Sequence, residues 1–165
     1  MPPTLSDQSA FKVTAIGVVK TAVPDAQISK SRRELVSEIV VFPAYSAALA
    51  GLEEYSHLII LFWMDRAPPL QALTRHPHEN PAQPLVGVLA MRGRSRPNPL
   101  GLAVVDLIAR NANTLLVRRL DAYHGSAVID IKPYDYYDAY PHIRVPAWSN
   151  SAPGRGALNH LSPKP

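Results

Sequence analysis

Three arginines occupy alternate positions just before a proline-rich turn. Arg92, Arg94 and Arg96 precede the segment Pro97–Pro99. Alternate residues of an extended segment project to the same side, so the spacing predicts one cationic ridge. Guanidinium groups bind phosphate and carboxylate oxygens in bidentate pairs, and the two prolines stiffen the backbone that presents Asn98. This segment is therefore a candidate anion- or RNA-binding loop; the alternative is a solvated basic turn.

A second set of polar residues lies near the end of the last expected strand. Asp130 and Lys132 are two positions apart, so they share one face of that strand. They could form an ion pair or bind a zwitterionic ligand, and the ring of Tyr134 could stack on a purine. The alternative is an ordinary surface ion pair, which contributes little, with the tyrosines forming a docking surface.

Two other segments carry weaker signals. Residues Gln27–Arg33 read as a polar and basic loop that could hold a carboxylate or a phosphate. The segment His76–Glu79 contains two histidines and a carboxylate, which are metal-ligand types, but Pro77 separates the histidines and no further ligand clusters nearby. With no cysteine in the chain, disulfides and thiolate chemistry are excluded. We expect no metal.

Size and composition exclude other classes of protein. A chain of 165 residues with 47% hydrophobic and 18% charged residues predicts one globular domain. The longest apolar run, Leu58–Met64, is too short to cross a bilayer as a helix, so no membrane span is expected. No secretory signal is visible, so the cytoplasm is the expected compartment. The net charge of +4 favours an anionic partner weakly.

Strands must position these residues, because the hydrophobic pattern of the apolar segments favours strands. The continuous apolar run at 57–64 predicts a central strand that is buried on both faces. We expect strands at 11–19, 35–42, 57–64, 85–91, 100–109, 114–120 and 127–132, the last three as a meander. One short helix is expected at 44–49, and Arg66–Pro84 is expected to be a long loop. Without long helices between strands, a doubly wound parallel sheet is not expected. The expected fold is all-β, a small antiparallel β-barrel or a sandwich, with short helices and long loops.

Four segments resemble the TsaA-like (TrmO, YaeB) family in order and spacing. They are IGVVKT (16–21), GLEEYSHLIILFWMDR (51–66), GVLAMRGRSRPNPLGLAVVDL (87–107) and LDAYHGSAVIDIKPY (120–134). The R-x-R-P-N-P-[IL]-G segment followed by D-I-K-P-Y is a specific combination. We accordingly expect an N-terminal tail at 1–10, a TsaA-like barrel domain at 11–140, and a C-terminal tail at 141–165 that could dock on a partner subunit.

The resemblance implies an S-adenosyl-L-methionine-dependent methyltransferase of a β-barrel class, unlike the Rossmann-type enzymes. Members of this family methylate N6 of threonylcarbamoyladenosine beside the tRNA anticodon, and act as homodimers with the cofactor near the subunit interface. The expected cofactor is therefore S-adenosyl-L-methionine, and the expected partners are tRNA and a second copy of the chain. The alternatives are a family member that binds the cofactor but has another substrate, and a non-catalytic RNA-binding barrel.

Site residues follow position by position from the same resemblance. Expected cofactor contacts are Gln27, Ile28, Ser29, Asp65, Arg66, Arg92, Leu102, His124, Gly125, Ser126 and Ala127. Expected RNA contacts are Arg94, Arg96 and Asn98, and the candidate catalytic residues are Asp130, Lys132 and Tyr134. Asp65 and Asp121, like Asp130, are candidate proton acceptors. The family's P-R-Q contact reads Gln27–Ser29 here, so Lys30 or Arg32 could replace its arginine.

Overall fold

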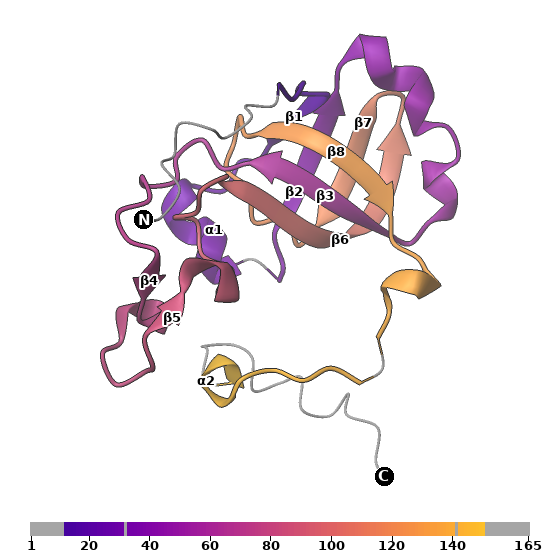
Figure 1. Cartoon of the computed structure of the whole chain (residues 1–165). Helices are drawn as coiled ribbons and strands as arrows, with labels where there is room; N and C mark the ends of the chain where they lie inside the picture. Colours follow the sequence, from indigo (N-terminus) through magenta and orange to yellow (C-terminus); the bar gives the residue numbers. More distant parts are fainter. Residues whose placement is uncertain (1–11, 32, 141, 151–165) are drawn as a thin grey trace.

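A closed antiparallel barrel forms the body of the computed structural model, which describes residues 12–31, 33–140 and 142–150. The six strands follow the order β1-β2-β7-β6-β3-β8 around the barrel (Figure 1). Their bounds are β1 Gly17–Lys20, β2 Val36–Val41, β3 His57–Trp63, β6 Leu100–Asn111, β7 Thr114–Arg118 and β8 Ala127–Pro133. The expected small antiparallel barrel is confirmed. Residues 1–10, expected as a tail, and residues 151–165 lie outside the described part.

The remaining elements are short and lie mostly at the two ends of the barrel. The α-helices are α1 Asp25–Ser31 and α2 Ala147–Asn150. The 3₁₀ helices are η2 Pro43–Leu49, η3 Leu52–Glu54, η4 Pro77–Glu79, η5 Val88–Ala90 and η6 Tyr136–Asp138. A separate two-stranded sheet pairs β4 Thr74–Arg75 with β5 Val86–Gly87. Among the described residues, no helix has both the length and the apolar character that crossing a membrane requires.

Alternation along the strands fills the barrel interior with aliphatic and aromatic side chains. On β3, Leu58, Ile60 and Phe62 are buried, while the residues between them are only partly buried. Val105 and Val117 meet them from β6 and β7, in the same core cluster. Burying one such side chain contributes about 1.5–3 kcal/mol, and a small barrel has an interior that side chains fill completely. The core therefore leaves no room for a ligand inside, and any site must lie on the rim or the outer wall.

Gly101 occupies one of these interior positions, directly opposite Phe62 in the β3–β6 register. A Cβ atom added at Gly101 would overlap the Phe62 ring, whose side chain is almost fully buried. The glycine at the end of the R-P-N-P-L-G segment is therefore a packing residue as well as part of a turn motif.

We expect Gly101→Ala to lower the free energy of unfolding by about 2 kcal/mol, because an overpacked core must displace a ring that has nowhere to go. Urea denaturation followed by tryptophan fluorescence measures the change. Gly93→Ala is the matched control, since nothing lies within 4 Å of the added Cβ there. Equal stability of the two variants would show that the Phe62 ring moves freely.

Three sequence expectations about the elements were wrong. Residues 85–91 were expected as a strand, but only Val86–Gly87 pairs, and η5 follows at once. The barrel closes with six other strands, so it offers no free edge to this segment. The expected loop 66–84 contains β4 and η4. The short helix expected at 44–49, by contrast, is present as the 3₁₀ helix η2. The segment Gln27–Arg33, read as a loop, contains most of α1, whose single buried apolar residue left no visible helical period.

The meander expected for the last three strands was wrong for β8, because β8 does not pair with β7. Strand β8 pairs with β1 and β3, whereas β7 pairs with β2 and β6. Its register with β3 shifts, because Phe62 pairs with Val128 but Leu61 pairs with Asp130. The extra residue, Ile129, forms a β-bulge, which reverses the alternation beyond it. Val128 consequently faces the core, while Asp130 and Lys132 lie on the outer wall.

Candidate functional site

Four loops meet at the end of the barrel that carries α1 (Figure 1). Strands β1, β3 and β7 end at this rim, and β2, β6 and β8 begin there, as antiparallel pairing requires. The loops consist of residues 21–35, 64–73, 91–99 and 119–126. Backbone bonds tie them to the barrel; Met64, for example, donates its N–H to the Pro99 carbonyl at 2.8 Å. Most of the expected cofactor contacts lie in these loops.

Arg66 links three of these loops. Its Nη1 donates to the Asp25 carboxylate on α1, and its Nη2 donates to the His124 carbonyl at 3.0 Å. The guanidinium carbon lies 5.4 Å from the centroid of the Tyr123 ring, within cation–π range. Its Nε lies 3.7 Å from Oδ2 of Asp65. The side chain remains 46% exposed, so this junction is open to solvent and to a ligand.

Tyr123 extends the junction to the proline-rich loop. Its hydroxyl accepts a hydrogen bond from Nη1 of Arg94 at 2.6 Å. Ser95 donates to the Pro69 carbonyl at 3.2 Å, which fixes the same loop against the segment after Arg66. The result is a continuous polar chain Arg94–Tyr123–Arg66–Asp25, referred to below as the rim cluster. Two cations, a carboxylate and an aromatic face are thereby held together at one edge of the barrel.

A tight turn at 124–126 anchors this edge on β1. Gly125 has φ +82°, a conformation that other residues adopt only with strain, and its N–H donates to the Val19 carbonyl at 2.8 Å. Ser126 is buried and donates its N–H to the Tyr123 carbonyl at 3.1 Å. Both N–H groups are thus used within the protein. Gly125 and Ser126, both expected cofactor contacts, therefore hold the turn in place, and the neighbouring His124 side chain is exposed.

The three arginines do not form a common ridge. Arg92 donates to the Leu102 carbonyl at 3.0 Å, Arg94 donates to Tyr123, and Arg96 folds back to the Met91 carbonyl at 2.7 Å. The segment is a series of bends rather than a strand, so alternate residues no longer point in one direction. Only Arg94 belongs to the rim cluster. Asn98, expected beside them as an RNA contact, is exposed on the same loop.

The candidate catalytic residues lie apart from the rim cluster within one chain. Lys132 Nζ and Asp130 Oδ2 form the anticipated ion pair, at 2.8 Å, on the outer wall of β8. Hydrogen bonding to Asp130 raises the pKa of Lys132, so this side chain is a cation and not a proton acceptor at neutral pH. Tyr134 lies at the opposite end of the barrel, where its N–H donates to the His57 carbonyl at 3.1 Å.

An apolar surface covers the outer wall of β3 and β6. Its cross-strand pairs are Ile59 with Val104, Leu61 with Leu102, and Trp63 with Leu100. The three β6 members are 38–48% exposed. Charged residues border the surface: His57 and Asp106 pair at 3.1 Å in the next row, and Asp130 and Lys132 lie opposite Leu61 and Ile59 on β8. We refer to these six apolar residues as the outer face; Leu102, an expected cofactor contact, is one of them.

Sequence reasoning missed two members of the rim cluster. Asp25 was overlooked because α1 was read as a loop, although Pro24 before an acidic residue is typical of a helix start. Tyr123 lies next to the expected loop 124–127 but carried no motif of its own. Ile28, an expected cofactor contact, is buried. Gln27 is exposed on α1, and Ala127 is the first residue of β8.

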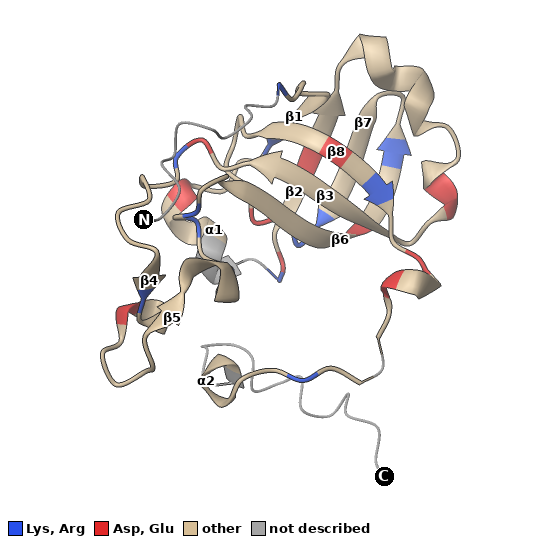
Figure 2. Ribbon diagram, in the orientation of Figure 1, with Lys and Arg blue, Asp and Glu red and all other residues tan. Residues whose placement is uncertain are grey.

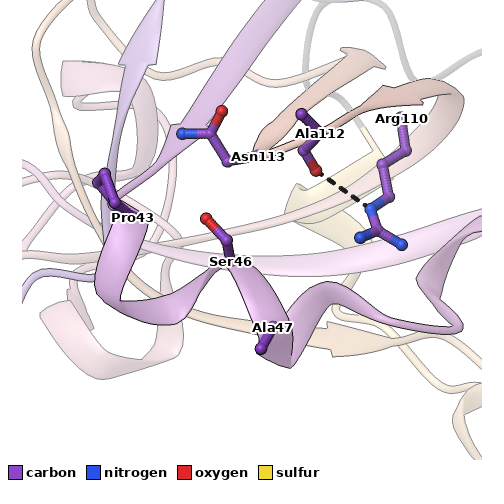
Figure 3. A pocket seen from close by; sticks show the side chains of 6 residues that line it. All are labelled: Pro43, Ser46, Ala47, Arg110, Ala112 and Asn113. Atoms are coloured by element: carbon purple, nitrogen blue, oxygen red, sulfur yellow. Dashed lines mark hydrogen bonds between the residues drawn. The ribbon is translucent and has the colours of Figure 1, made fainter.

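A wide depression at the opposite end of the barrel carries no comparable chemistry. It encloses about 520 Å³ between η2 and the β6–β7 turn, and Figure 3 shows its lining residues. Its one charged side chain, Arg110, donates to the Ala112 carbonyl and pairs with Glu53 at 2.6 Å. In the part of the chain that the structure describes, no three histidine or acidic residues are grouped so that they could hold a metal ion.

Comparison with known proteins places these features in context. Residues 19–139 match the family described as tRNA-methyltransferase O N-terminal domain. An S-adenosyl-L-methionine-binding protein of Archaeoglobus fulgidus is 42% identical over 122 residues, which are 72% of this chain and 86% of the relative. The tRNA (adenine(37)-N6)-methyltransferase of Rattus norvegicus is 34% identical over 108 residues, which are 64% of this chain and 25% of the rat protein.

Solved structures agree with the sequence relatives. A crystal structure of TrmO superposes with a TM-score of 0.65 at 29% identity, covering 84% of this chain and 62% of that chain. TrmO from Pseudomonas aeruginosa gives a TM-score of 0.65 at 28% identity, covering 82% of this chain and 61% of that one. A second Archaeoglobus fulgidus relative, named a probable S-adenosyl-L-methionine-binding protein, is covered over 33% of its length. This chain thus spans only part of several relatives.

Proposed function

Because the chain belongs to the family of the tRNA-methyltransferase O N-terminal domain, we propose that it binds S-adenosyl-L-methionine at the rim cluster and methylates N6 of threonylcarbamoyladenosine beside the tRNA anticodon. The observation that carries this proposal is the junction at Arg66, where three loops expected to contact the cofactor meet. Names of relatives add support: one is an S-adenosyl-L-methionine-binding protein and another a tRNA (adenine(37)-N6)-methyltransferase.

The groups at the rim cluster fit the chemistry of this cofactor. A guanidinium such as Arg66 binds a carboxylate in bidentate fashion. The carboxylates of Asp25 and Asp65 accept hydrogen bonds from an ammonium group or from ribose hydroxyls. The Tyr123 ring already faces one cation at 5.4 Å, so its negative face suits a sulfonium as well. Each charged part of the cofactor therefore has a complementary group within this junction.

The chain's own residues have two tasks in the transfer. When bound, S-adenosyl-L-methionine supplies an activated methyl group, so the protein contributes mainly alignment and exclusion of water. Arg66 and Tyr123 hold the donor at the rim, and Arg94 holds Tyr123. The adenine N6 must also lose a proton, and Asp65 is a half-exposed carboxylate directly beside Arg66 in these rim loops. Asp65 Oδ1 or Oδ2 is therefore our assignment for the proton acceptor.

In this proposal the enzyme is a homodimer that pairs through the outer face. An exposed apolar surface with a charged border has the composition of a protein interface. The border contains both signs of charge, so it can complement itself in a two-fold arrangement. Beyond the barrel, Tyr136, Tyr137 and Ile143 are 96%, 89% and 75% exposed on a segment that runs away from the barrel in Figure 1. This segment provides a second surface for the partner subunit.

Two measurements test the proposed function. Isothermal titration calorimetry with S-adenosyl-L-methionine should give a measurable heat of binding for the wild-type chain. Incubation with labelled cofactor and tRNA that carries threonylcarbamoyladenosine, followed by digestion to nucleosides, should yield its N6-methylated form. Absence of any binding heat would contradict the cofactor assignment.

A second candidate is a cofactor-binding family member with a different methyl acceptor. Relatives that carry only the name S-adenosyl-L-methionine-binding protein favour it. A departure from the family motif also favours this candidate. The family's P-R-Q contact falls on α1 at Gln27–Ser29, which has no arginine, and Arg66 instead pairs with Asp25 on that helix. Binding heat without labelled tRNA nucleosides would select this candidate.

A further inference from the structure

A second group of arginines lies farther along the same rim, where β7 ends. Arg118 is the last residue of β7, and its pairing with Val36 brings the segment before β2 alongside. Arg33, Glu34, Asp106, Arg118 and Arg119 together line a pocket of about 330 Å³. The proposed cofactor junction uses none of these five residues. In Figure 2 the basic residues of the strands and rim are blue and the acidic residues are red.

Arg119 holds an unusual backbone conformation at this pocket. Its φ is +78°, in the left-handed region that favours glycine. Its N–H donates to the Leu35 carbonyl at 2.8 Å, and the next residue, Leu120, is fully buried. These two anchors keep the residue in place despite the strain. Among the described residues the Arg119 guanidinium has no hydrogen bond or ion pair, so the strained backbone does not serve an internal contact of this side chain. Strain of this kind concentrates at functional positions.

The lining chemistry fits a ribose-phosphate unit. Three guanidinium groups provide bidentate donors for phosphate oxygens. Two carboxylates, Glu34 and Asp106, accept hydrogen bonds from hydroxyl groups, and the 2′-hydroxyl distinguishes RNA from DNA. Asp106 Oδ2 lies 4.0 Å from Arg118 Nη1, a distance at the limit of an ion pair, so Arg118 is only weakly engaged within the protein. A purely anionic ligand would not need the two acids.

The pocket also lies within reach of the proposed methylation site. Arg119 and His124 are five positions apart, a separation that a fully extended chain spans in about 17 Å at most. We propose that Arg33, Arg118 and Arg119 bind the backbone of the RNA substrate a few nucleotides from the target adenosine. This inference rests on the proposed function, because it takes tRNA as the substrate. Beyond that function, the inference assigns three residues that bind the RNA backbone outside the proposed cofactor site.

The test compares tRNA binding by the full chain and its Arg119→Gly variant. Glycine removes both the charge and the backbone strain, so the midpoint of thermal unfolding should rise while RNA binding weakens. Loss of one phosphate contact should lower the affinity for tRNA about fivefold near 0.1 M salt and reduce the slope of log affinity against log salt by about 1. Fluorescence anisotropy with labelled tRNA over a series of salt concentrations measures both. Arg118→Ala should also lower the affinity for tRNA and reduce the salt slope.

Control variants distinguish RNA binding by Arg119 from the general effect of a positive charge on tRNA affinity. Arg110→Ala removes one positive charge at the opposite end of the barrel and should leave the tRNA affinity within twofold of wild type. Arg119→Lys retains the charge and should recover most of the affinity. Calorimetry should show wild-type affinity for S-adenosyl-L-methionine in all of these variants. A single variant that loses both ligands together would indicate structural damage and would overturn the assignment.

Failure of this inference differs from failure of the proposed function. If Arg119→Gly and Arg118→Ala bind and methylate tRNA as the wild type does, the pocket does not hold RNA, and the proposed reaction stands. If the wild type binds tRNA through these arginines but transfers no methyl group, the pocket assignment stands and the proposed reaction fails. If the wild type does not bind tRNA at any salt concentration, both fail.

Discussion

Replacing Arg66 with alanine should lower the affinity for S-adenosyl-L-methionine about 100-fold, because two charge-assisted contacts of about 1.5 kcal/mol each would be lost. The guanidinium now connects Asp25, Tyr123 and His124, and these are the groups that would surround the cofactor. Isothermal titration calorimetry measures the affinity. Stability should change by less than about 1 kcal/mol, since exposed ion pairs contribute little.

Two further variants define what this result means. Arg75→Ala removes an exposed arginine that pairs with Glu79 at 2.8 Å in the β4 segment, and should leave the affinity unchanged. Arg66→Lys keeps the charge but not the planar fork, so it should bind with intermediate affinity. If Arg66→Ala bound the cofactor within threefold of wild type, the rim cluster would not be the cofactor site.

Replacing Val104 with glutamate should convert the proposed homodimer to a monomer, raising the dimer dissociation constant about 100-fold or more. Val104 pairs with Ile59 at the middle of the outer face. In a two-fold interface each substitution places a carboxylate in an apolar surface twice, and an unpaired buried charge costs several kcal/mol. Sedimentation equilibrium of wild type and variant measures the mass. Methyl transfer should fall in parallel if the partner completes the site.

Leu89→Glu is the control for this substitution. Leu89 is 71% exposed on η5, outside the outer face, so a charge there should leave the dimer intact. A wild-type chain that sediments as a monomer at every concentration, or a Val104→Glu variant that remains dimeric, would remove the outer face as the interface.

Much of the architecture could be predicted from local sequence patterns. The apolar run at 57–64 predicts a strand, because a short apolar segment is a local feature. That the strand is buried on both faces was wrong: Leu58, Ile60 and Phe62 are buried, while the residues between them belong to the outer face. The specific motifs at 87–107 and 120–134 also identified the family, since each lies within one continuous segment. The spacing of Asp130 and Lys132 allowed an ion pair or a ligand site, and the structure forms the ion pair.

Other features depend on contacts between segments far apart in the chain. Asp25 and Tyr123 meet at Arg66, 41 residues from the former by sequence, and no local pattern reports such a meeting. The divergence of Arg92, Arg94 and Arg96 depends on three separate partners, so their spacing could not predict it.

By itself, the sequence determined which residues alternate, which turns are stiff and which family the chain resembles, because these properties depend on neighbours within a few positions. The tertiary structure decided the insertion of β8 between β1 and β3, the bulge at Ile129, and the packing of Gly101 against Phe62. Barrel closure sets these long-range registers all at once, and a register shift of one residue moves a side chain from the core to the surface.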